Sequence, residues 1–490
     1  MAMSTTTIRI TTTMCVRFVP WVSSCVPWVG FLLTKCVYLF IFFILSEMGK
    51  EEIMMNKHFD YVYVSANELY DAYLHCLKRK RTTVNAQEFM MDEALNISKL
   101  YYDLNSLKYK VGKSIAFIIT EPVCREVFAA DFRDRIVHHL IIDRTMEYFE
   151  KEFDYDSYSC REGKGVDFGV RRCYEHMEQA SNGFTKDTYV LKCDLKSFFM
   201  TIDKDKLYNK LSDFIDRNYK GTEKDIFFVK HLIKLVVYDN PQKKCIKKSP
   251  DYKWDLLPKN KSLFYTDENH GLPIGNLTSQ IFANFYLNEF DNFVKEELGF
   301  VHYGRYVDDF YIYSNDVKSL LRAKELCRKK LKDMGVTLHP NKIYVQEINK
   351  GLTFIGAMMK PKRIFTGKRT YNKFKNAIYN YIKELNLMKE NNIIPSKEYL
   401  LHLITCINSY LGFMKHRKTF NLRKEILLDK NMGIIYDYCY PSLDLSKLTL
   451  YREYMKVVSS KKHTVTREYA KTTFLIERIK ETIFNNKNKK

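Results

Sequence analysis

Apolar positions along this chain follow a helical period in some stretches and an extended-chain period in others. Helical spacing predicts helices over residues 64–107, from a Ser65 cap, and over residues 132–149. Stretches rich in β-branched and aromatic residues predict strands at 116–120, 124–130 and 189–193. The first two strands are joined at Glu121-Pro122, where proline favours a turn. This pattern predicts a mixed helix and strand architecture.

A further pair of strands frames two adjacent acidic residues. Residues 303–307 and 310–313 read as strands, with Asp308 and Asp309 between them as the tight turn of a hairpin. Aspartate tolerates turn conformations, so a plain turn is one interpretation. Strand alternation would place the two carboxylates on opposite faces. Because two negative charges between apolar strands are costly without a cation, we favour a divalent-metal site.

The second half of the chain is predicted to be mostly helical after this hairpin. Residues 316–335 form a basic amphipathic helix, residues 352–358 a hairpin, and residues 371–430 two or more helices, one of them starting at Ser396. Residues 238–270 are polar and rich in lysine, which predicts an ordered insertion loop. That loop could contact nucleic acid or a protein partner, or could be a solvated excursion, and the pattern leaves both open.

Composition adds a candidate partner. The chain of 490 residues contains 79 Lys and Arg against 58 Asp and Glu, a net charge of +21, which favours a polyanionic partner such as nucleic acid over a merely basic surface. The 35 Tyr and 33 Phe suit base stacking and ordinary cores equally well. The 12 Cys are scattered singly, which argues against a zinc site and fits reduced thiols in a cytosol.

The first 46 residues differ from the rest. They contain no Asp or Glu, and residues 36–45 are continuously apolar. If residues 26–46 are a true anchor, the membrane is a partner; a signal-like segment is a second interpretation. We favour a third, that residues 1–47 are translated upstream sequence ahead of a start at Met48, Met54 or Met55.

A third carboxylate lies upstream of the hairpin. Asp194 ends the apolar strand at 189–193, and Asp203 is expected to cap the helix that follows. An aspartate at a strand end can face an aspartate at a neighbouring hairpin tip. Such carboxylates hold two Mg²⁺ ions about 3.5–4 Å apart for phosphoryl displacement.

At this point the residues resemble a known family. Asp194 within 193–199, the block at 271–291 and Tyr306–Asp309 are similar to the motifs of reverse transcriptases, and further blocks follow in the same order over about 115–420. The sequence of residues 274–280, IGNLTSQ, resembles that of bacterial diversity-generating retroelement enzymes most. Defence-associated bacterial reverse transcriptases are also close.

The resemblance implies an α+β right-hand polymerase with fingers, a palm containing an antiparallel sheet, and a helical thumb. The expected divisions are a hydrophobic segment at 1–47, a helical region with the fingers at 48–185, the palm at 186–365 with its insertion, the thumb at 366–430 and a basic extension at 431–490.

The resemblance also assigns the chemistry. It implies that Asp194, Asp308 and Asp309, with the Leu195 carbonyl, bind two Mg²⁺ ions, for which Mn²⁺ could substitute. Lys342 matches the position proposed to protonate the leaving pyrophosphate, although a phosphate contact or an exposed strand position is an open alternative.

The substrate-binding residues follow from the same resemblance. Phe199 falls at the sugar gate, where a large ring would clash with a ribose 2′-hydroxyl. Arg125 matches the arginine that binds the triphosphate, while Val123 stands where a lysine is usual, so Lys110 or Lys113 could substitute. Gly275 and Gln280 belong to the block that meets template and nucleotide. Ile274 and Gln280 depart from the common pattern, a variant associated in the retroelement enzymes with relaxed fidelity.

Basic residues offer nucleic-acid contacts. The helix at 132–149 carries Arg133 and Arg135, and the loop after it carries Arg161 and Lys164, which could wrap a phosphate.

The expected function is RNA-directed DNA synthesis in the cytoplasm, with two metal ions, deoxynucleoside triphosphates, a template RNA and a DNA or RNA primer. A retroelement role, with an accessory protein, and an antiviral defence role with unusual priming or templating share this site. An RNA-binding scaffold with a polymerase fold is the non-enzymatic alternative. An RNA-dependent RNA polymerase is a further class, against which Phe199 and the block order argue.

Overall fold

The computed structural model describes residues 59, 61–78, 80–120 and 123–455. The chain divides into two compact units, one ending at Lys110 and the other beginning at Val111. The predictions for residues 1–47, for the turn at Glu121-Pro122 and for the tail beyond 455 lie outside the described residues.

The described part of the first unit is helical, as predicted for 64–107. It contains α2 (Ala66–Leu77), α3 (Val84–Met91) and α4 (Glu93–Asn105). The Ser65 hydroxyl accepts a hydrogen bond from the Glu68 backbone N–H at 3.2 Å, which confirms the predicted cap. The buried side chain of Asn105 accepts from the backbone N–H groups of Tyr63 and Val64, so the segment before α2 is tied to the end of α4.

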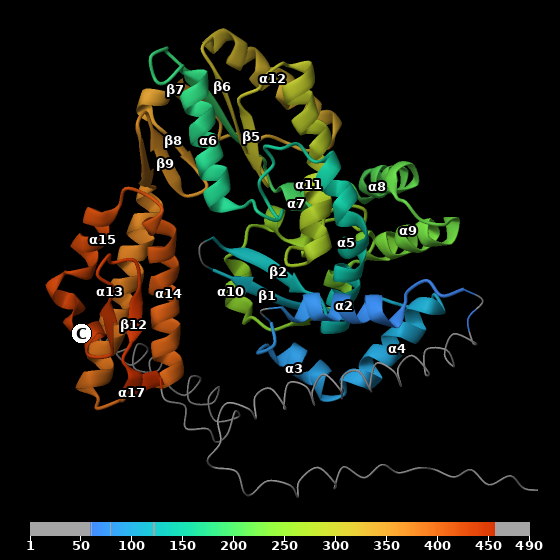
Figure 1. Cartoon of the computed structure of the whole chain (residues 1–490), viewed down its shortest axis with the longest axis horizontal. Coiled ribbons are helices and arrows are strands. Elements are labelled where there is room, and N and C mark those ends of the chain that lie inside the picture. The colour runs from blue at the N-terminus through green and yellow to red at the C-terminus, as the bar shows by residue number, and fades with distance from the viewer. Residues whose placement is uncertain (1–58, 60, 79, 121–122, 456–490) are drawn as a thin grey trace, which may run out of the picture. The chain divides into compact units, whose positions relative to one another are not determined.

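The centre of the second unit is a four-stranded antiparallel sheet, the expected palm (Figure 1). Its order is β5-β6-β3-β7, and its strands are β5 (Tyr303–Tyr306), β6 (Asp309–Ser314), β3 (Tyr189–Asp194) and β7 (Tyr344–Glu347). Helix α6 (Val166–Ala180) covers one face, where His176 Nδ1 lies 3.0 Å from the Tyr311 hydroxyl. Helix α11 (Leu277–Asn292) covers the other, where the rings of Phe290 and Phe310 stack edge to face. Alternation along β6 thus buries both faces.

A second sheet belongs to the fingers. Strands β1 (Ile115–Ile119) and β2 (Arg125–Ala129) pair antiparallel, as the sequence predicts, and β4 (Ile246–Lys247) adds in parallel to β1. Helix α5 (Phe132–Glu152) follows β2. After β3 come three helices: α7 (Phe198–Thr201), α8 (Lys204–Asn218), capped by Asp203 as predicted, and α9 (Glu223–Val237).

The insertion at 238–270 is ordered, as expected. Besides β4 it contains α10 (Asp251–Asp255) and three short 3₁₀ turns, η1 (Pro241–Lys243), η2 (Lys259–Lys261) and η3 (Leu263–Tyr265). It packs against the fingers sheet and is not a solvated excursion.

Helix α12 (Val317–Asp333) is the predicted basic helix, and the predicted hairpin at 352–358 is confirmed as β8 (Leu352–Phe354) and β9 (Ala357–Lys360). A third strand, β10 (Arg363–Thr366), pairs with β9. Two single turns complete this region, η4 (Phe293–Glu297) and η5 (Ile348–Lys350).

The thumb consists of two long helices and a smaller cap. Helices α13 (Lys368–Glu390) and α14 (Lys397–Lys415) are followed by α15 (Phe420–Leu427), η6 (Lys430–Met432), α16 (Gly433–Tyr436), the β11 (Cys439–Pro441) and β12 (Leu448–Leu450) pair and α17 (Arg452–Met455). The Ser396 hydroxyl caps α14, as predicted.

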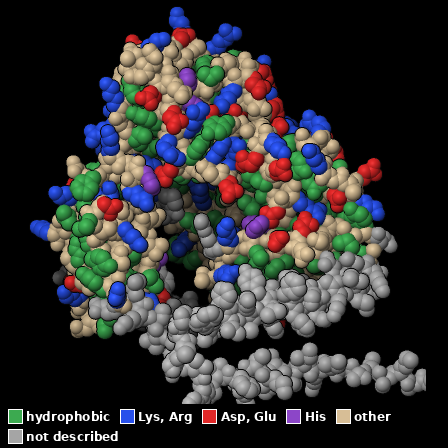
Figure 2. Space-filling model, viewed as in Figure 1, with side chains coloured by type: hydrophobic (Ala, Val, Ile, Leu, Met, Phe, Trp, Pro, Cys, Tyr) green, Lys and Arg blue, Asp and Glu red, His purple; other side chains and the backbone are tan. Residues whose placement is uncertain are grey.

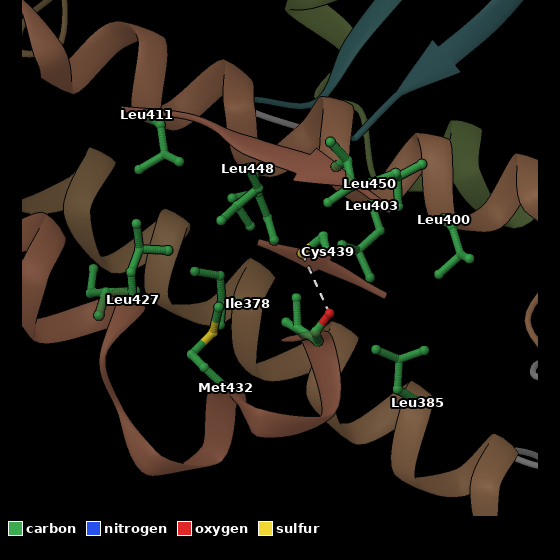
Figure 3. Close-up of a cluster of buried hydrophobic side chains, with 14 of the residues drawn as sticks. Ile378, Leu385, Leu400, Leu403, Leu411, Leu427, Met432, Cys439, Leu448 and Leu450 are labelled. Atoms are coloured by element: carbon green, nitrogen blue, oxygen red, sulfur yellow. Dashed lines mark hydrogen bonds between the residues drawn. The ribbon is translucent and has the colours of Figure 1, made fainter. Parts of the chain in front are cut away.

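The thumb extends beyond residue 430, where the sequence suggested a separate extension. Cys439, Leu448 and Leu450 are buried in one cluster with side chains of α13 and α14 (Figure 3). The Asn408 side chain of α14 donates to the Leu448 carbonyl at 2.9 Å and accepts from its N–H at 2.7 Å. These bonds join β12 to the helix, so residues up to 450 belong to the thumb core.

Across the described ranges, none of the helices combines the length and apolarity that crossing a bilayer requires.

Candidate active site

The palm sheet brings the first and last of the predicted acidic residues side by side. Asp194 ends β3, Asp309 begins β6, and the two are direct partners in the antiparallel register. The backbone around them is held on both sides. Leu195 N–H donates to the Asp308 carbonyl at 2.9 Å, and His339 N–H donates to the Asp194 carbonyl at 2.7 Å. The end of β3 is therefore fixed against both the hairpin and the segment before β7.

The hairpin turn differs by one residue from the prediction. Its two central residues are Val307 and Asp308, and Asp309 is already paired with Tyr306. Val307 has a φ of 57°, the left-handed region that a β-branched residue rarely adopts. A positive φ at the first central position suits the twist of a two-residue hairpin. The pattern of strand-forming residues could not reveal this, because Val307 itself favours strands.

Arg305 supports the backbone of this turn, and no sequence motif had singled out this residue. Its guanidinium is buried and donates to both Asp291 oxygens, from Nε at 2.7 Å and from Nη2 at 2.5 Å. Its Nη1 donates to the Val307 carbonyl at 3.0 Å. The two-pronged ion pair thus fixes the strained residue. An arginine inside an apolar strand was the available signal, since a buried charge needs a partner.

A second buried carboxylate, Asp156, supports the same strand. Its backbone carbonyl accepts from the Arg305 N–H at 2.9 Å, and its side chain accepts from Arg172 Nε and Lys295 Nζ, both at 2.7 Å. Burial alone would raise the pKa of Asp156, but Arg172, His176 and Lys295 outweigh burial and lower it. Asp156 is therefore held as a carboxylate, and the loop before α6 that contains it is fixed against β5.

Two lysines form ion pairs with the acidic residues. Lys342 Nζ is 3.0 Å from each oxygen of Asp194, so the predicted proton donor is next to the predicted metal ligand. Lys192, which no sequence motif had singled out, forms an ion pair with Asp309. Burial lowers the pKa of Lys192 to about 8, although Asp194 and Asp308 oppose this. A lysine within an apolar strand, two residues before Asp194 and so on the same face, could have indicated it.

The donor set suits a divalent ion. Burial raises the pKa of Asp308, and the nearby charge of Asp194 raises it further. A bound dication would relieve this repulsion, and carboxylate oxygens are the ligands that Mg²⁺ and Mn²⁺ prefer. As placed, no group of three or more Asp, Glu, His or Cys side chains in the described ranges is arranged to hold a metal. Asp194 and Asp308 offer the oxygen ligands that such an ion prefers, but a bound ion would have to displace Lys342 from Asp194, just as Lys192 now pairs with Asp309.

Arg125 and Phe199 are the residues to which the resemblance assigns nucleotide contacts. Arg125 begins β2 and is exposed, and its charge lowers the pKa of Asp308, so it lies within electrostatic reach of that carboxylate. Phe198 is buried in the core, while Phe199 is only partly buried. Their sugar-gate and triphosphate roles stay predictions.

Gly275 is required by the protein's own backbone. Its φ is +120°, and a Cβ there would lie 2.8 Å from Val127 Cγ1 and 2.9 Å from the Phe128 carbonyl oxygen. The close approach shown by the structure is to strand β2, whereas the resemblance implied an approach to template and nucleotide. Gln280 lies in the first turns of α11, and its side-chain oxygen accepts from the Cys160 thiol at 3.0 Å.

The four basic residues predicted to bind nucleic acid differ in availability. Arg161 is buried and donates to Glu150 from Nε at 2.9 Å. Lys164 lies 4.2 Å from the centre of the Tyr155 ring, and burial lowers its pKa to about 8. Arg135 donates to the Ala130 carbonyl, and Arg133 lies beside Asp134. Arg161 therefore has a structural role here, and phosphate binding by the four stays a prediction.

Comparisons with known proteins bear on this site. Residues 125–359, just under half of the chain, match the family described as reverse transcriptase (RNA-dependent DNA polymerase). Apo telomerase from Candida tropicalis, truncated from its C-terminal domain, is 12% identical with a TM-score of 0.37, over 56% of this chain and 60% of that chain. Telomerase from Candida albicans in complex with a fragment of telomeric RNA is 12% identical with a TM-score of 0.38, over 71% and 63%. A search of curated proteins found no match.

The chain spans less than two thirds of either telomerase chain. The family match includes Arg125, β3, the 271–291 block, the acidic hairpin and Lys342. The match to the reverse transcriptase family thus extends over residues 125–359, which include the palm sheet and the strand that carries Arg125.

Proposed function

We propose that the protein is an RNA-directed DNA polymerase that adds deoxynucleotides to a primer 3′-hydroxyl opposite an RNA template. One observation carries the proposal: within the matched domain, Asp194 and Asp309 are register partners, and Asp308 lies at the turn beside them. The family generally uses divalent metal ions, and we propose two Mg²⁺, with Mn²⁺ as a substitute.

Each group in the site has a task in this reaction. Asp194 and Asp308 would hold the metal, which when bound activates the attacking hydroxyl and stabilises the leaving pyrophosphate. Arg125 would bind the triphosphate through charge-assisted hydrogen bonds. Phe199 would exclude a ribose 2′-hydroxyl. Lys342, which donates a hydrogen bond to Asp194 in this structure, would instead contact the pyrophosphate and donate a proton to it.

The biological role is proposed as a retroelement role in the cytoplasm, with a template RNA and an accessory protein. The sequence of residues 274–280 supports the retroelement role, and the singly scattered cysteines support the cytoplasmic location. An antiviral defence role uses the same site, and the neighbouring genes would separate the two. A non-catalytic RNA-binding scaffold is less favoured, because all three carboxylates are retained.

Primer extension on an RNA template tests the activity. Asp308→Asn should reduce deoxynucleotide incorporation about a thousandfold, because losing one ligand charge weakens metal binding in the transition state. Asp333→Asn is the matched control, since it alters an exposed carboxylate at the end of α12.

Undiminished synthesis by Asp308→Asn would contradict the metal assignment. Preferred incorporation of ribonucleotides by the unmodified protein would contradict the sugar-gate role of Phe199. Absence of synthesis on RNA, with synthesis on DNA, would contradict the template assignment.

A further inference from the structure

We infer that the insertion at 238–270 sets the relative position of the two elements that contact the deoxynucleotide, and that Glu126 is the positioning residue that joins the insertion to the strand carrying Arg125. The inference rests on the proposed function, because it concerns how nucleotide is selected at that site.

Strand β2 separates two environments. Arg125 is exposed and acts electrostatically on Asp308. The next residue, Glu126, points to the opposite face and is 1% exposed. Phe128 is buried on that same face and packs with Leu263 of the insertion. The two faces of one strand thus carry the predicted triphosphate contact and the insertion contact.

Glu126 is held by the insertion itself. One carboxylate oxygen accepts from the Ser262 hydroxyl at 2.7 Å, and the other accepts from the Leu263 N–H at 2.7 Å. Burial raises the pKa of this carboxyl, while the two hydrogen bonds and Lys247 oppose the shift. A buried carboxyl with two donors from one segment fixes that segment, because breaking either bond leaves a buried polar group unsatisfied.

The edge of the sheet provides a second attachment. Strand β4 extends the fingers sheet beside β1, and Ile246 N–H donates to the Ser114 carbonyl at 2.9 Å. The Ser249 hydroxyl accepts from Ile118 N–H at 2.8 Å. The insertion therefore continues the sheet in addition to covering it.

Aromatic side chains complete the cover. The ring of Phe264 lies 5.6 Å from that of Phe128 and 5.4 Å from that of Trp254. Lys247 Nζ lies over the Phe264 ring at 4.3 Å. Such contacts order the insertion over the face of the fingers sheet that carries Glu126 and Phe128.

The same insertion reaches the segment that carries Phe199. Phe199 and Met200 pack in one cluster with Leu263, Phe128 and Ile274. The backbone after the insertion returns the contact, since Leu272 N–H donates to the Phe199 carbonyl at 2.8 Å. Asn260 donates to the Ser197 hydroxyl at 3.0 Å.

These contacts place the insertion between two substrate-binding elements. Glu126 connects it to the strand of Arg125, and the cluster around Leu263 connects it to Phe199. The insertion thereby sets the position of the sugar gate relative to the triphosphate contact. Small errors in such positioning cost rate and selectivity out of proportion to their size.

Steady-state kinetics of purified protein test the inference. Glu126→Ala should raise the KM for deoxynucleotides about tenfold and lower discrimination against ribonucleotides about tenfold, with a smaller change in kcat. Ser262→Ala removes one of the two donors and should change both quantities in the same direction by less. Asp255→Ala, an exposed carboxylate of α10 in the same insertion, is the control and should change neither.

Hydrogen exchange adds a readout of the attachment, because a detached insertion should exchange faster at 246–265. Unchanged discrimination and KM in Glu126→Ala would overturn the inference, as would equal effects in Asp255→Ala. If Glu126→Ala does not fold, unchanged discrimination in Ser262→Ala overturns it. Failure of the unmodified protein to extend a primer would instead overturn the proposed function.

Discussion

At the scale of single residues, the acidic hairpin depends on a conformation that its sequence does not favour. Val307 sits in the left-handed region, which costs about 1–2 kcal/mol for a residue with a Cβ. The hydrogen bond from Arg305 to the Val307 carbonyl helps to hold Val307 in this conformation. Strain of this kind persists where the surroundings over-determine the backbone.

Replacing Val307 by glycine tests this strain. Val307→Gly should leave the free energy of unfolding within about 1 kcal/mol of the unmodified protein, because relief of strain offsets the larger entropy of the unfolded chain. Val345→Gly, in the extended strand β7, relieves no strain and should cost about 1–2 kcal/mol. Urea denaturation measures both. An equal loss in the two variants would argue against strain at Val307.

At the scale of elements, strand β2 organises the fingers. One edge pairs with β1, and the other accepts the loop before α11, where Phe128 N–H donates to the Ile274 carbonyl at 2.8 Å. The buried Asn276 side chain accepts from Ala130 N–H at 3.3 Å in the same junction. The glycine of that loop is therefore part of the contact between fingers and palm.

Gly275→Ala should disrupt this junction. The added methyl group meets Val127 and the Phe128 carbonyl at a φ that alanine avoids, so we expect a loss of about 2 kcal/mol or more. Gly412→Ala is the matched control within α14, where a Cβ meets nothing within 4 Å, and it should stabilise by about 0.5–1 kcal/mol. Thermal or urea unfolding distinguishes them. A neutral Gly275→Ala would contradict the close approach.

At the scale of the whole molecule, the excess of basic residues is spread out. Lysine and arginine side chains are distributed over the face shown in Figure 2, among acidic ones. A net charge of +21 should make nucleic-acid binding strongly dependent on salt. The thumb helix α13 buries Phe374, Ile378 and Leu385 and leaves Lys375 and Lys383 exposed.

The thumb lysines give a quantitative test of duplex binding. Changing Lys375 and Lys383 together to alanine should weaken binding of an RNA–DNA duplex and reduce the slope of log affinity against log salt by about 2, one per lost phosphate contact. Fluorescence anisotropy at several salt concentrations measures the slope. The matched control changes the exposed Lys329 and Lys332 of α12, and an equal reduction there would argue against a thumb clamp.

The sequence by itself determined the elements with strong local patterns and singled out the acidic residues. The helices α5, α8, α12 and α14, the caps at Ser65, Asp203 and Ser396, and the strands β1, β2 and β3 follow from local periodicity and capping. Asp194, Asp308 and Asp309 stood out because charges next to apolar strands need a cation. These signals are local, so one chain suffices to read them.

Only the tertiary structure decided the groups that hold this site. Arg305 meets Asp291, Lys192 meets Asp309, and Glu126 meets Ser262, which lies 136 positions away in the chain. The position of the acidic turn moved by one residue because strand register and the bond to Arg305 outweighed the strand preference of Val307. The thumb gained residues up to 450 in the same way, through burial against distant helices. Partners distant in sequence leave no local period, and so the groups that hold the acidic residues in place appear only once the sheets are assembled.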